Sequence, residues 1–130
     1  PDIYGNMTMK DLEAMIWAHC EDRGVEVEFF QSNSEGAIID AIQEALTDDD
    51  GIVINPAAYS HTSIAIADAI RTVRLPAVEV HISDLTTREP YRRHSYVAEA
   101  CIQTIMGRGF QGYLDAIDAL ILHLGGELEG

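Results

Sequence analysis

The sequence predicts a small three-layer α/β domain, in which helices cover both faces of a parallel β-sheet. Helical and strand patterns alternate along the chain, which indicates crossover connections between parallel strands. Short apolar runs such as GIVIN (51–55) are typical of strands that are buried on both faces. The chain has 130 residues, 47% of them hydrophobic, which is enough for one packed core. We therefore expect a single domain over residues 1–130.

The first half of the chain predicts two helices and two strands. Thr8 is placed to cap a helix over 8–23, and Ser34 to cap a second helix over 35–46. The alternating segment 25–30 predicts a strand, and 51–55 predicts another. The residues expected to face the core are Leu12, Met15, Ile16 and His19 or Cys20 in the first helix, and Ile38, Ile39, Ile42 and Leu46 in the second.

The second half continues the alternation. Ser60 or Thr62 is placed to cap a third helix that ends near Val73, with Ile66, Ala69 and Ile70 on its inner face. A strand over 75–83 begins near Pro76, where a missing N–H is tolerated. The loop 84–94, a final strand over 100–106 and a helix over 113–124 follow, although periodicity alone does not distinguish 100–106 from a helix. We expect the tail 125–130 to be frayed.

The order of elements also predicts that one strand of the sheet is missing from this sequence. A doubly wound sheet begins with a strand, whereas this chain begins with a helix. In the flavodoxin-like strand order 2-1-3-4-5, strand 1 lies inside the sheet. Without it, two neighbouring strands would have unpaired backbone edges. We therefore expect a preceding strand in the natural protein.

Composition and charge exclude several classes of partner. The net charge is −14, which predicts repulsion of nucleic acids and of anionic membranes. Neither a run of about 18 apolar residues nor a signal peptide is visible, so we expect a cytoplasmic protein. Cys20 and Cys101 fit no metal or redox spacing and are predicted to be buried thiols. Lys10 is the only lysine, which excludes Schiff-base and P-loop chemistry elsewhere.

Polar side chains stand where two of the predicted strands end. Asn55 closes the strand 51–55, His61 follows in the next turn, and His81 and Ser83 close the strand 75–83. In open α/β sheets, ligands bind outside the carboxyl ends of the strands. Each residue alone is more often a turn former or a structural histidine. Together with Arg88 in the following loop, they predict a site for a polyhydroxylated anion.

Charged residues near this edge add to the prediction. Arg88, Arg92 and Arg93 fall within six residues of an otherwise acidic chain, which favours an anionic ligand. The alternative is a solvated loop whose arginines pair with surrounding carboxylates. Glu79 lies two residues before His81, so both side chains face the same side of the sheet. A carboxylate beside an imidazole favours the imidazolium form and suits a general acid, unless Glu79 is paired elsewhere.

The segments that carry these residues resemble the type II 3-dehydroquinate dehydratase family, also called the type II dehydroquinases. The matching pieces, in family order, are IYG (3–5), QSNSEG (31–36), INPAAYSHTS (54–63), LPAVEVHIS (75–83), TREPYRRHSY (87–96) and GRGFQGY (107–113). The resemblance implies a lyase without metal or cofactor that converts 3-dehydroquinate to 3-dehydroshikimate. The implied reaction is an anti elimination through an enolate, in the shikimate pathway of aromatic amino acid biosynthesis or in quinate metabolism.

The resemblance also implies residue roles. Tyr4 would be the base that takes the C2 proton, Arg88 would favour its tyrosinate form, and His81, held by Glu79, would be the general acid. The positions that match substrate-binding residues are Asn55, His61, Ile82, Ser83 and Arg92, and Asp68 matches an acid that reaches into a neighbouring subunit's site. Family members are homo-oligomers, usually trimers assembled as a dodecamer.

The sequence departs from this family at its start. In the family, a strand and a loop that carries an Asn and a lid Arg precede the stretch that begins here with PDIYG. We therefore interpret residues 1–7 as a lid remnant and expect the 130-residue chain alone to be inactive. The alternatives are a flavodoxin-like or receiver-like binding module, and a non-catalytic assembly subunit. A receiver needs a lysine after a late strand, and the intact Tyr4, Asn55, His81 and Arg88 argue against an inactive subunit.

Overall fold

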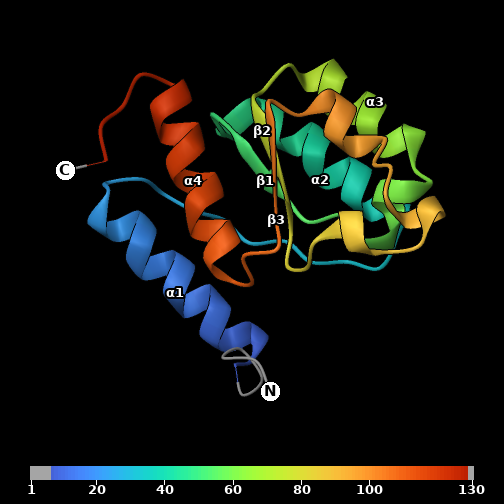
Figure 1. The fold of residues 1–130 in the computed structure, drawn as a ribbon. Coiled ribbons are helices and arrows are strands. Elements are labelled where there is room, and N and C mark those ends of the chain that lie inside the picture. Colours follow the sequence, from blue (N-terminus) through green and yellow to red (C-terminus); the bar gives the residue numbers. More distant parts are fainter. Residues whose placement is uncertain (1–6, 129–130) are drawn as a thin grey trace.

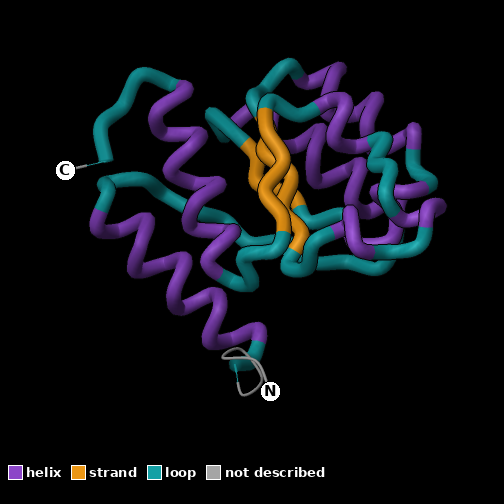
Figure 2. The backbone as a smooth tube through the Cα atoms, viewed as in Figure 1, coloured by secondary structure: helices purple, strands orange, loops and turns teal. Residues whose placement is uncertain are grey.

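The computed structural model describes residues 7–128, which form a parallel sheet with helices on both faces (Figure 1). The strands are β1 (Ile52–Ile54), β2 (Ala77–His81) and β3 (Gln103–Met106), in the spatial order β1-β2-β3. In Figure 2 they lie side by side between the two groups of helices. The predicted three-layer α/β class is therefore confirmed, and these strands follow one another as strands 3, 4 and 5 of the predicted order do.

Four helices flank the sheet in the described part of the chain: α1 (Met9–Asp22), α2 (Glu35–Asp48), α3 (Ile64–Val73) and α4 (Gln111–His123). The predicted caps of the first two are confirmed. Thr8 and Asp11 form a capping box, in which each side chain accepts a hydrogen bond from the other residue's backbone N–H. Ser34 accepts from the backbone N–H of Ala37 at the start of α2.

The start of α3 differs from the prediction. Its cap is Ser63, whose hydroxyl accepts from the backbone N–H of Ile66 over 2.9 Å. The prediction of Ser60 or Thr62 is wrong because Ala57–His61 forms a separate 3-10 turn. Within that turn the Ser60 hydroxyl donates to the carbonyl of Ala57 over 2.7 Å, so it is not available to a later helix.

Helices α2 and α3 cover one face of the sheet, and α4 covers the other with α1 packed against it (Figure 1). The alternation of side chains along β2 explains the division, since Val78 and Val80 pack toward α4. The core under α2 and α3 consists of Ile42, Ile54, Ile66, Ala69, Ile70, Val73, Ala77 and Val97. Leu46 was predicted to be inside and is 58% exposed, because the helix turns Ala45 inward instead.

Residues 25–30 do not form a strand, so this prediction is wrong. The segment is extended, and Val25 and Val27 pack into the cluster between α1 and α4. A strand requires a backbone neighbour as well as an alternating sequence, and none of residues 7–128 forms a ladder with this segment. Phe29 and Phe30 remain exposed. The predicted lid remnant lies outside the described residues, except for Met7. The tail 125–130 was expected to be frayed, but Leu128 packs against the same cluster.

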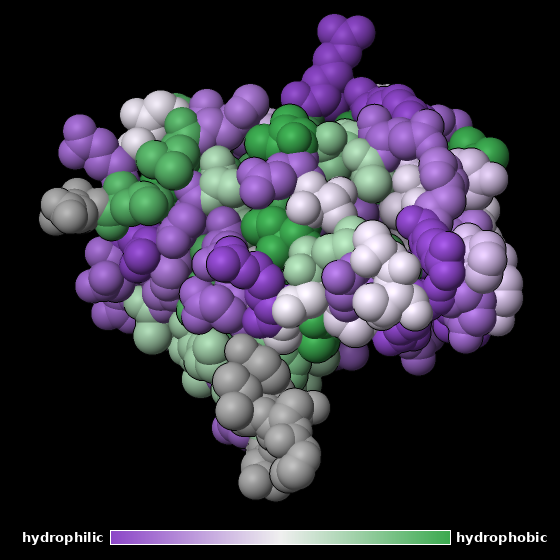
Figure 3. Space-filling view, viewed as in Figure 1, coloured by the Kyte–Doolittle hydropathy of each residue, from purple (hydrophilic) through white to green (hydrophobic). Residues whose placement is uncertain are grey.

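The surface is mixed in character. On the face seen in Figure 3, apolar residues form small islands among hydrophilic ones. Within residues 7–128, none of the helices combines the length and the apolarity that a membrane crossing requires. Of the cysteines, Cys20 is fully buried as predicted, whereas Cys101 is only partly buried.

Candidate active site

A cavity of about 400 Å³ lies beyond the carboxyl ends of β1 and β2. Seven residues predicted from the sequence line it: Asn55, His61, His81, Ile82, Ser83, Arg88 and Arg92. Ala57, Ala58 and Leu85 complete the lining. The parallel sheet explains the gathering, because strands that run in the same direction deliver their last residues to one edge.

Glu79 and His81 form the most buried part of this site. Both project from the same face of β2, and they are 0% and 5% exposed. His81 Nε2 lies 3.1 Å from Glu79 Oε2, although its N–H is not aligned with that oxygen as a hydrogen bond requires. The predicted pairing is therefore present as a close charge contact, and Nδ1 is the ring nitrogen that remains for a ligand.

Two hydroxyl groups hold the carboxylate of Glu79 from below the cavity. Ser95 Oγ donates to Oε2 over 2.6 Å, and Thr104 Oγ1 donates to Oε1 over 3.2 Å. Burial alone would raise the pKa of Glu79, but the contacts with His81, Ser95 and Thr104 outweigh it, so the pKa lies below its ordinary value. Glu79 is thus a buried carboxylate that stays ionised.

Neither hydroxyl was predicted as a functional residue. Thr104 faces Glu79 because the two are partners in the ladder between β2 and β3. Ser95 lies in a loop, and its approach to Glu79 depends on the path of that loop. Only the register of the sheet could have pointed to Thr104, and no sequence signal marks Ser95.

Asn55 is held at both ends of its amide. Its Oδ1 accepts from the backbone N–H of Ala57 over 3.0 Å, and its Nδ2 donates to the hydroxyl of Tyr113 over 2.8 Å. The first contact fixes the orientation of the amide, since only the oxygen can accept from an N–H. One Nδ2 proton therefore remains for a ligand in the cavity. Tyr113, in the first turn of α4, was not predicted as part of the site.

His61 is fixed by the backbone of the loop after β2. Its Nδ1 lies 2.8 Å from the carbonyl oxygen of His94. Because a carbonyl can only accept, Nδ1 carries the proton and Nε2 is the nitrogen left for a ligand. The neighbouring N–H of Tyr96 donates to the carbonyl of Ser60 over 2.8 Å, so the two loops are joined at this point.

The three arginines of the cluster differ in their surroundings: some line the cavity, and others bind groups of the protein itself. Arg88 lines the cavity, and its Nη2 donates to Ser83 Oγ over 2.7 Å. Arg92 also lines the cavity and pairs with Glu89, with Nε 3.0 Å from Oε2. Arg93 instead braces the loop, since its Nε donates to the carbonyl of Arg88 over 2.7 Å. Two of the three arginines are thus positioned to meet an anion.

Two described residues of the predicted site do not line this cavity: Glu79, which is fully buried beside His81, and Asp68. Asp68 lies on the exposed side of α3, where it pairs with Arg71 over 3.2 Å. Its side chain is 66% exposed and does not line the cavity. Tyr4 lies outside the described residues. Among the residues that are described, no group of three or more His, Cys, Asp or Glu side chains is arranged to hold a metal ion.

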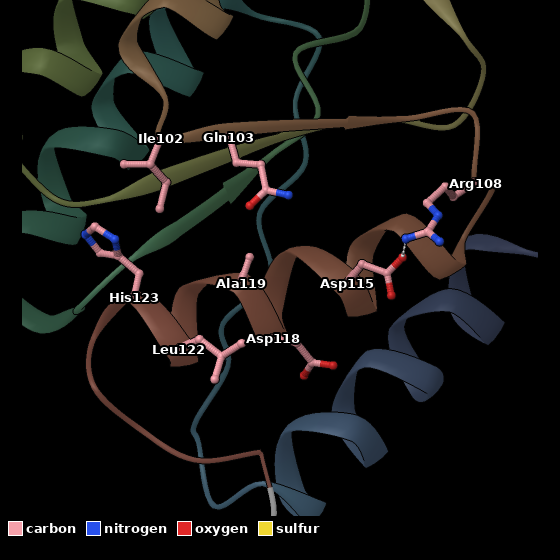
Figure 4. A pocket seen from close by; sticks show the side chains of 8 residues that line it. All are labelled: Ile102, Gln103, Arg108, Asp115, Asp118, Ala119, Leu122 and His123. Atoms are coloured by element: carbon pink, nitrogen blue, oxygen red, sulfur yellow. Dashed lines mark hydrogen bonds and ion pairs between the residues drawn. The ribbon is translucent and has the colours of Figure 1, made fainter.

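A larger hollow of about 650 Å³ lies elsewhere, between the edge of β3 and helix α4 (Figure 4). Its lining includes an ion pair between Arg108 and Asp115, whose nitrogen and oxygen are 2.6 Å apart. Figure 4 shows that Ile102 and Gln103 enter it from the strand side and Leu122 and His123 from the helix. It contains none of the predicted site residues. The smaller cavity, which His81 lines beside the buried Glu79, is therefore the candidate active site.

Comparison with known proteins relates the chain to one enzyme family. The family model "Dehydroquinase class II" matches residues 1–121. The 3-dehydroquinate dehydratase of Clostridium botulinum is 48% identical over 124 residues, which are 95% of this chain and 84% of that protein. The catabolic 3-dehydroquinase of Aspergillus clavatus is also 48% identical, over 95% of this chain and 82% of that protein.

Solved structures give the same result. The crystal structure of type II dehydroquinase from Butyrivibrio crossotus is 49% identical with a TM-score of 0.87, over 91% of this chain and 83% of that one. The type II dehydroquinase from Propionibacterium acnes is 42% identical with a TM-score of 0.86, over 92% and 83% of the two chains. Because the family model spans almost the whole sequence and the fold agrees, this chain belongs to the class II dehydroquinase family.

Proposed function

We propose that this protein removes water from 3-dehydroquinate to give 3-dehydroshikimate. The observation that carries the proposal is the contact between His81 and the ionised Glu79 at the wall of a cavity lined by an amide, an imidazole and two arginines. Such a set suits a small, polyhydroxylated carboxylic acid. The names of the relatives, both "3-dehydroquinate dehydratase" and "Catabolic 3-dehydroquinase", support the same substrate.

Binding of the substrate is assigned to the groups that have hydrogen-bonding capacity left. The backbone N–H groups of Ile82 and Ser83 donate to no other described residue, so they receive the carboxylate. The second Nδ2 proton of Asn55 and Nε2 of His61 bind hydroxyl groups of the ring. Arg92 adds positive charge at the rim.

The elimination then needs a base and an acid on opposite sides of the bond. Tyr4 takes the proton from C2, and an enolate forms. Arg88 lies at the cavity, where its charge favours the tyrosinate form of this base. His81 gives its proton to the C1 hydroxyl, which leaves as water while the enolate collapses to the conjugated enone. Glu79 stabilises the imidazolium before this transfer.

The test is a continuous assay with 3-dehydroquinate and the protein at its full natural length. We expect the ultraviolet absorbance of the enone product to rise steadily. His81→Ala should abolish the rise, whereas His123→Ala, which changes a histidine at the far end of α4, should leave it intact. A folded protein that produces no absorbance, or a fully active His81→Ala variant, would overturn the proposal.

Assembly and location form the finer part of the proposal. We infer a cytoplasmic homo-oligomer, trimers assembled as a dodecamer, in which Asp68 reaches the site of a neighbouring subunit. The exposure of Asp68 on α3, away from its own cavity, supports this role. Mixed oligomers provide a test: Asp68→Ala and His81→Ala subunits, each impaired alone, should regain activity when reassembled together. No recovery in verified mixed oligomers would exclude the shared site.

A further inference from the structure

The carboxylate of Glu79 is oriented by hydroxyl groups and not by His81. Each of its oxygens accepts a hydrogen bond from a hydroxyl, Oε2 from Ser95 and Oε1 from Thr104. The imidazole N–H lies close but is not aligned with either oxygen as a hydrogen bond requires. The position of the negative charge is therefore fixed by the two hydroxyl groups.

We propose that Ser95 and Thr104 are positioning residues for the general acid, which hold Glu79 ionised and aimed at His81. The inference rests on the proposed function, because it assigns a task to the groups behind the proposed acid. Neither hydroxyl lines the cavity, so neither touches the substrate. Both act through Glu79.

Ser95 donates its hydroxyl proton to Glu79. Its Oγ accepts from the backbone N–H of Ala98 over 3.1 Å, which leaves its own proton for Glu79. The residues on either side are pinned, His94 through its carbonyl to His61 and Tyr96 through its N–H to Ser60. The same loop therefore places a ligand-binding imidazole in the cavity and a donor beneath the catalytic carboxylate.

The pairing of strands in the sheet fixes the position of Thr104. Its pairing with Glu79 in the parallel ladder puts both side chains on one face of adjacent strands. Strand pairs are rigid in comparison with loops, so this donor is a fixed point. Ser95 and Thr104 thus approach the carboxylate from independent elements, a loop and a strand.

Other titratable groups around Glu79 do not supply a competing charge. Burial raises the pKa of the Cys101 thiol to about 12, and the negative charge of Glu79 adds to this effect. The thiol is therefore neutral at physiological pH. Among the described side chains in contact with Glu79, His81 is the one that can carry a positive charge. The two hydroxyl groups consequently hold the negative charge of Glu79 next to the one side chain that can become an imidazolium.

The experiment removes each hydroxyl in an active enzyme. Ser95→Ala and Thr104→Val should each lower kcat about ten- to a hundredfold, as expected when a charged group loses a hydrogen bond, with KM within about twofold. The alkaline limb of the kcat profile should move to lower pH, because a carboxylate that is no longer held 3.1 Å from the imidazole stabilises the imidazolium less. Thr104→Ser keeps the hydroxyl, so it should have the kcat of the wild type and the same alkaline limb of the kcat profile.

Ser63→Ala is the matched control. Ser63 is also buried and also donates to a carboxylate over 2.6 Å, in this case that of Glu35, but it lies outside the site. It should lower stability and leave the pH profile of kcat unchanged. If Ser95→Ala does not fold, the Thr104→Val and Thr104→Ser pair decides. Wild-type turnover that depends on His81, together with unchanged kcat and pH limb in the hydroxyl variants, would overturn this inference and leave the proposed function standing.

Discussion

Asn55 and Tyr113 lie 58 residues apart in the sequence, and the amide Nδ2 of one donates to the hydroxyl of the other over 2.8 Å. This bond joins the end of β1 to the first turn of α4. The other end of the amide accepts from the N–H of Ala57, a residue with a φ of 52°. A left-handed conformation is unfavourable for alanine, so the amide helps to hold the cavity wall in this shape.

Tyr113→Phe should weaken substrate binding more than it slows the chemical step. The change removes one partner of a neutral hydrogen bond, so we expect KM to rise about two- to tenfold with kcat changed less. Steady-state kinetics with 3-dehydroquinate measures both constants. Burial raises the pKa of Tyr113, with a smaller opposing effect from Asn55, so the hydroxyl stays protonated and this effect should not vary between pH 6 and pH 9.

Tyr59→Phe is the control for this prediction. Tyr59 also makes a hydrogen bond of 2.8 Å, to the carbonyl of Asn33, and does not line the cavity. Loss of the Tyr59 hydroxyl should change the free energy of unfolding and leave KM unchanged. An unchanged KM in a folded Tyr113→Phe variant would show that Asn55 keeps its orientation without the tyrosine.

The ionised state of Glu79 should be visible in the stability of the protein. Because its pKa is lowered below the ordinary value of 4.5, folding gains stability from the carboxylate at higher pH. That gain is complete above about pH 4.5 and is lost as the pH falls through the still lower pKa of the folded state. Glu79→Gln should therefore cost about 3 kcal/mol at pH 7, the effect of breaking a buried charged network.

The difference between the wild type and Glu79→Gln should shrink as the pH is lowered from 5 to 3. Urea unfolding at several pH values measures it. Glu99→Gln serves as a control, since this carboxylate pairs with His94 on the surface and is 53% exposed. A gap in the free energy of unfolding that stays constant down to pH 3 would contradict the assignment of Glu79 as the ionised, buried group.

The sequence predicts the positions of site residues correctly where a local pattern determines them. Glu79 and His81 face the same side because a strand alternates with a period of two, and Asn55 and Ser83 reach one cavity because parallel strands end together. The sequence does not predict a site residue whose position depends on a partner far away in the chain. Ser95 became part of the site through the path of a loop, a contact that no spacing in the sequence encodes.

The same distinction explains the errors in the fold. Residues 25–30 alternate as a strand does, but pairing is a property of the neighbouring backbone and not of the segment. Leu46 continues the apolar spacing of α2, yet the phase of the helix turns Ala45 to the core. Ser60 has the right side chain for a cap, and the 3-10 turn after Pro56 delays the helix until Ser63. In each case the packing of other elements outweighs a weak local preference.

The Cys101 thiol should react slowly with thiol reagents. With a pKa of about 12, its thiolate fraction at pH 8 is roughly a thousandfold smaller than that of an ordinary exposed cysteine. In a Cys20→Ala variant, in which Cys101 is the remaining thiol, the rate of reaction should rise about tenfold per pH unit from pH 7 to pH 10. Absorbance of the released chromophore from an aromatic disulfide reagent measures the rate. A fast reaction at pH 7 that levels off near pH 9 would contradict the raised pKa.

Asp118 should be the main polar contact between α1 and the rest of the domain. Its Oδ1 accepts from Arg23 Nε over 2.7 Å and lies 2.8 Å from His19 Nε2, so one oxygen of α4 contacts a side chain of α1 and the residue that caps it. These groups are mostly buried, and α1 and α4 also share an apolar cluster. Asp118→Asn should therefore lower the free energy of unfolding by about 1–3 kcal/mol, since hydrogen bonds to a charged group are lost.

Hydrogen exchange can locate this loss, and a surface variant controls for the change in charge. The backbone amides of α1 should exchange faster in Asp118→Asn than those of α3, because α1 is held mainly by α4. Asp22→Asn removes an aspartate that is 81% exposed and 3.4 Å from Arg23, and it should change stability by no more than about 0.5 kcal/mol. Equal effects of the two substitutions would mean that α1 is held by its apolar face, through Leu12 and Ile16, and not by the contact with Asp118.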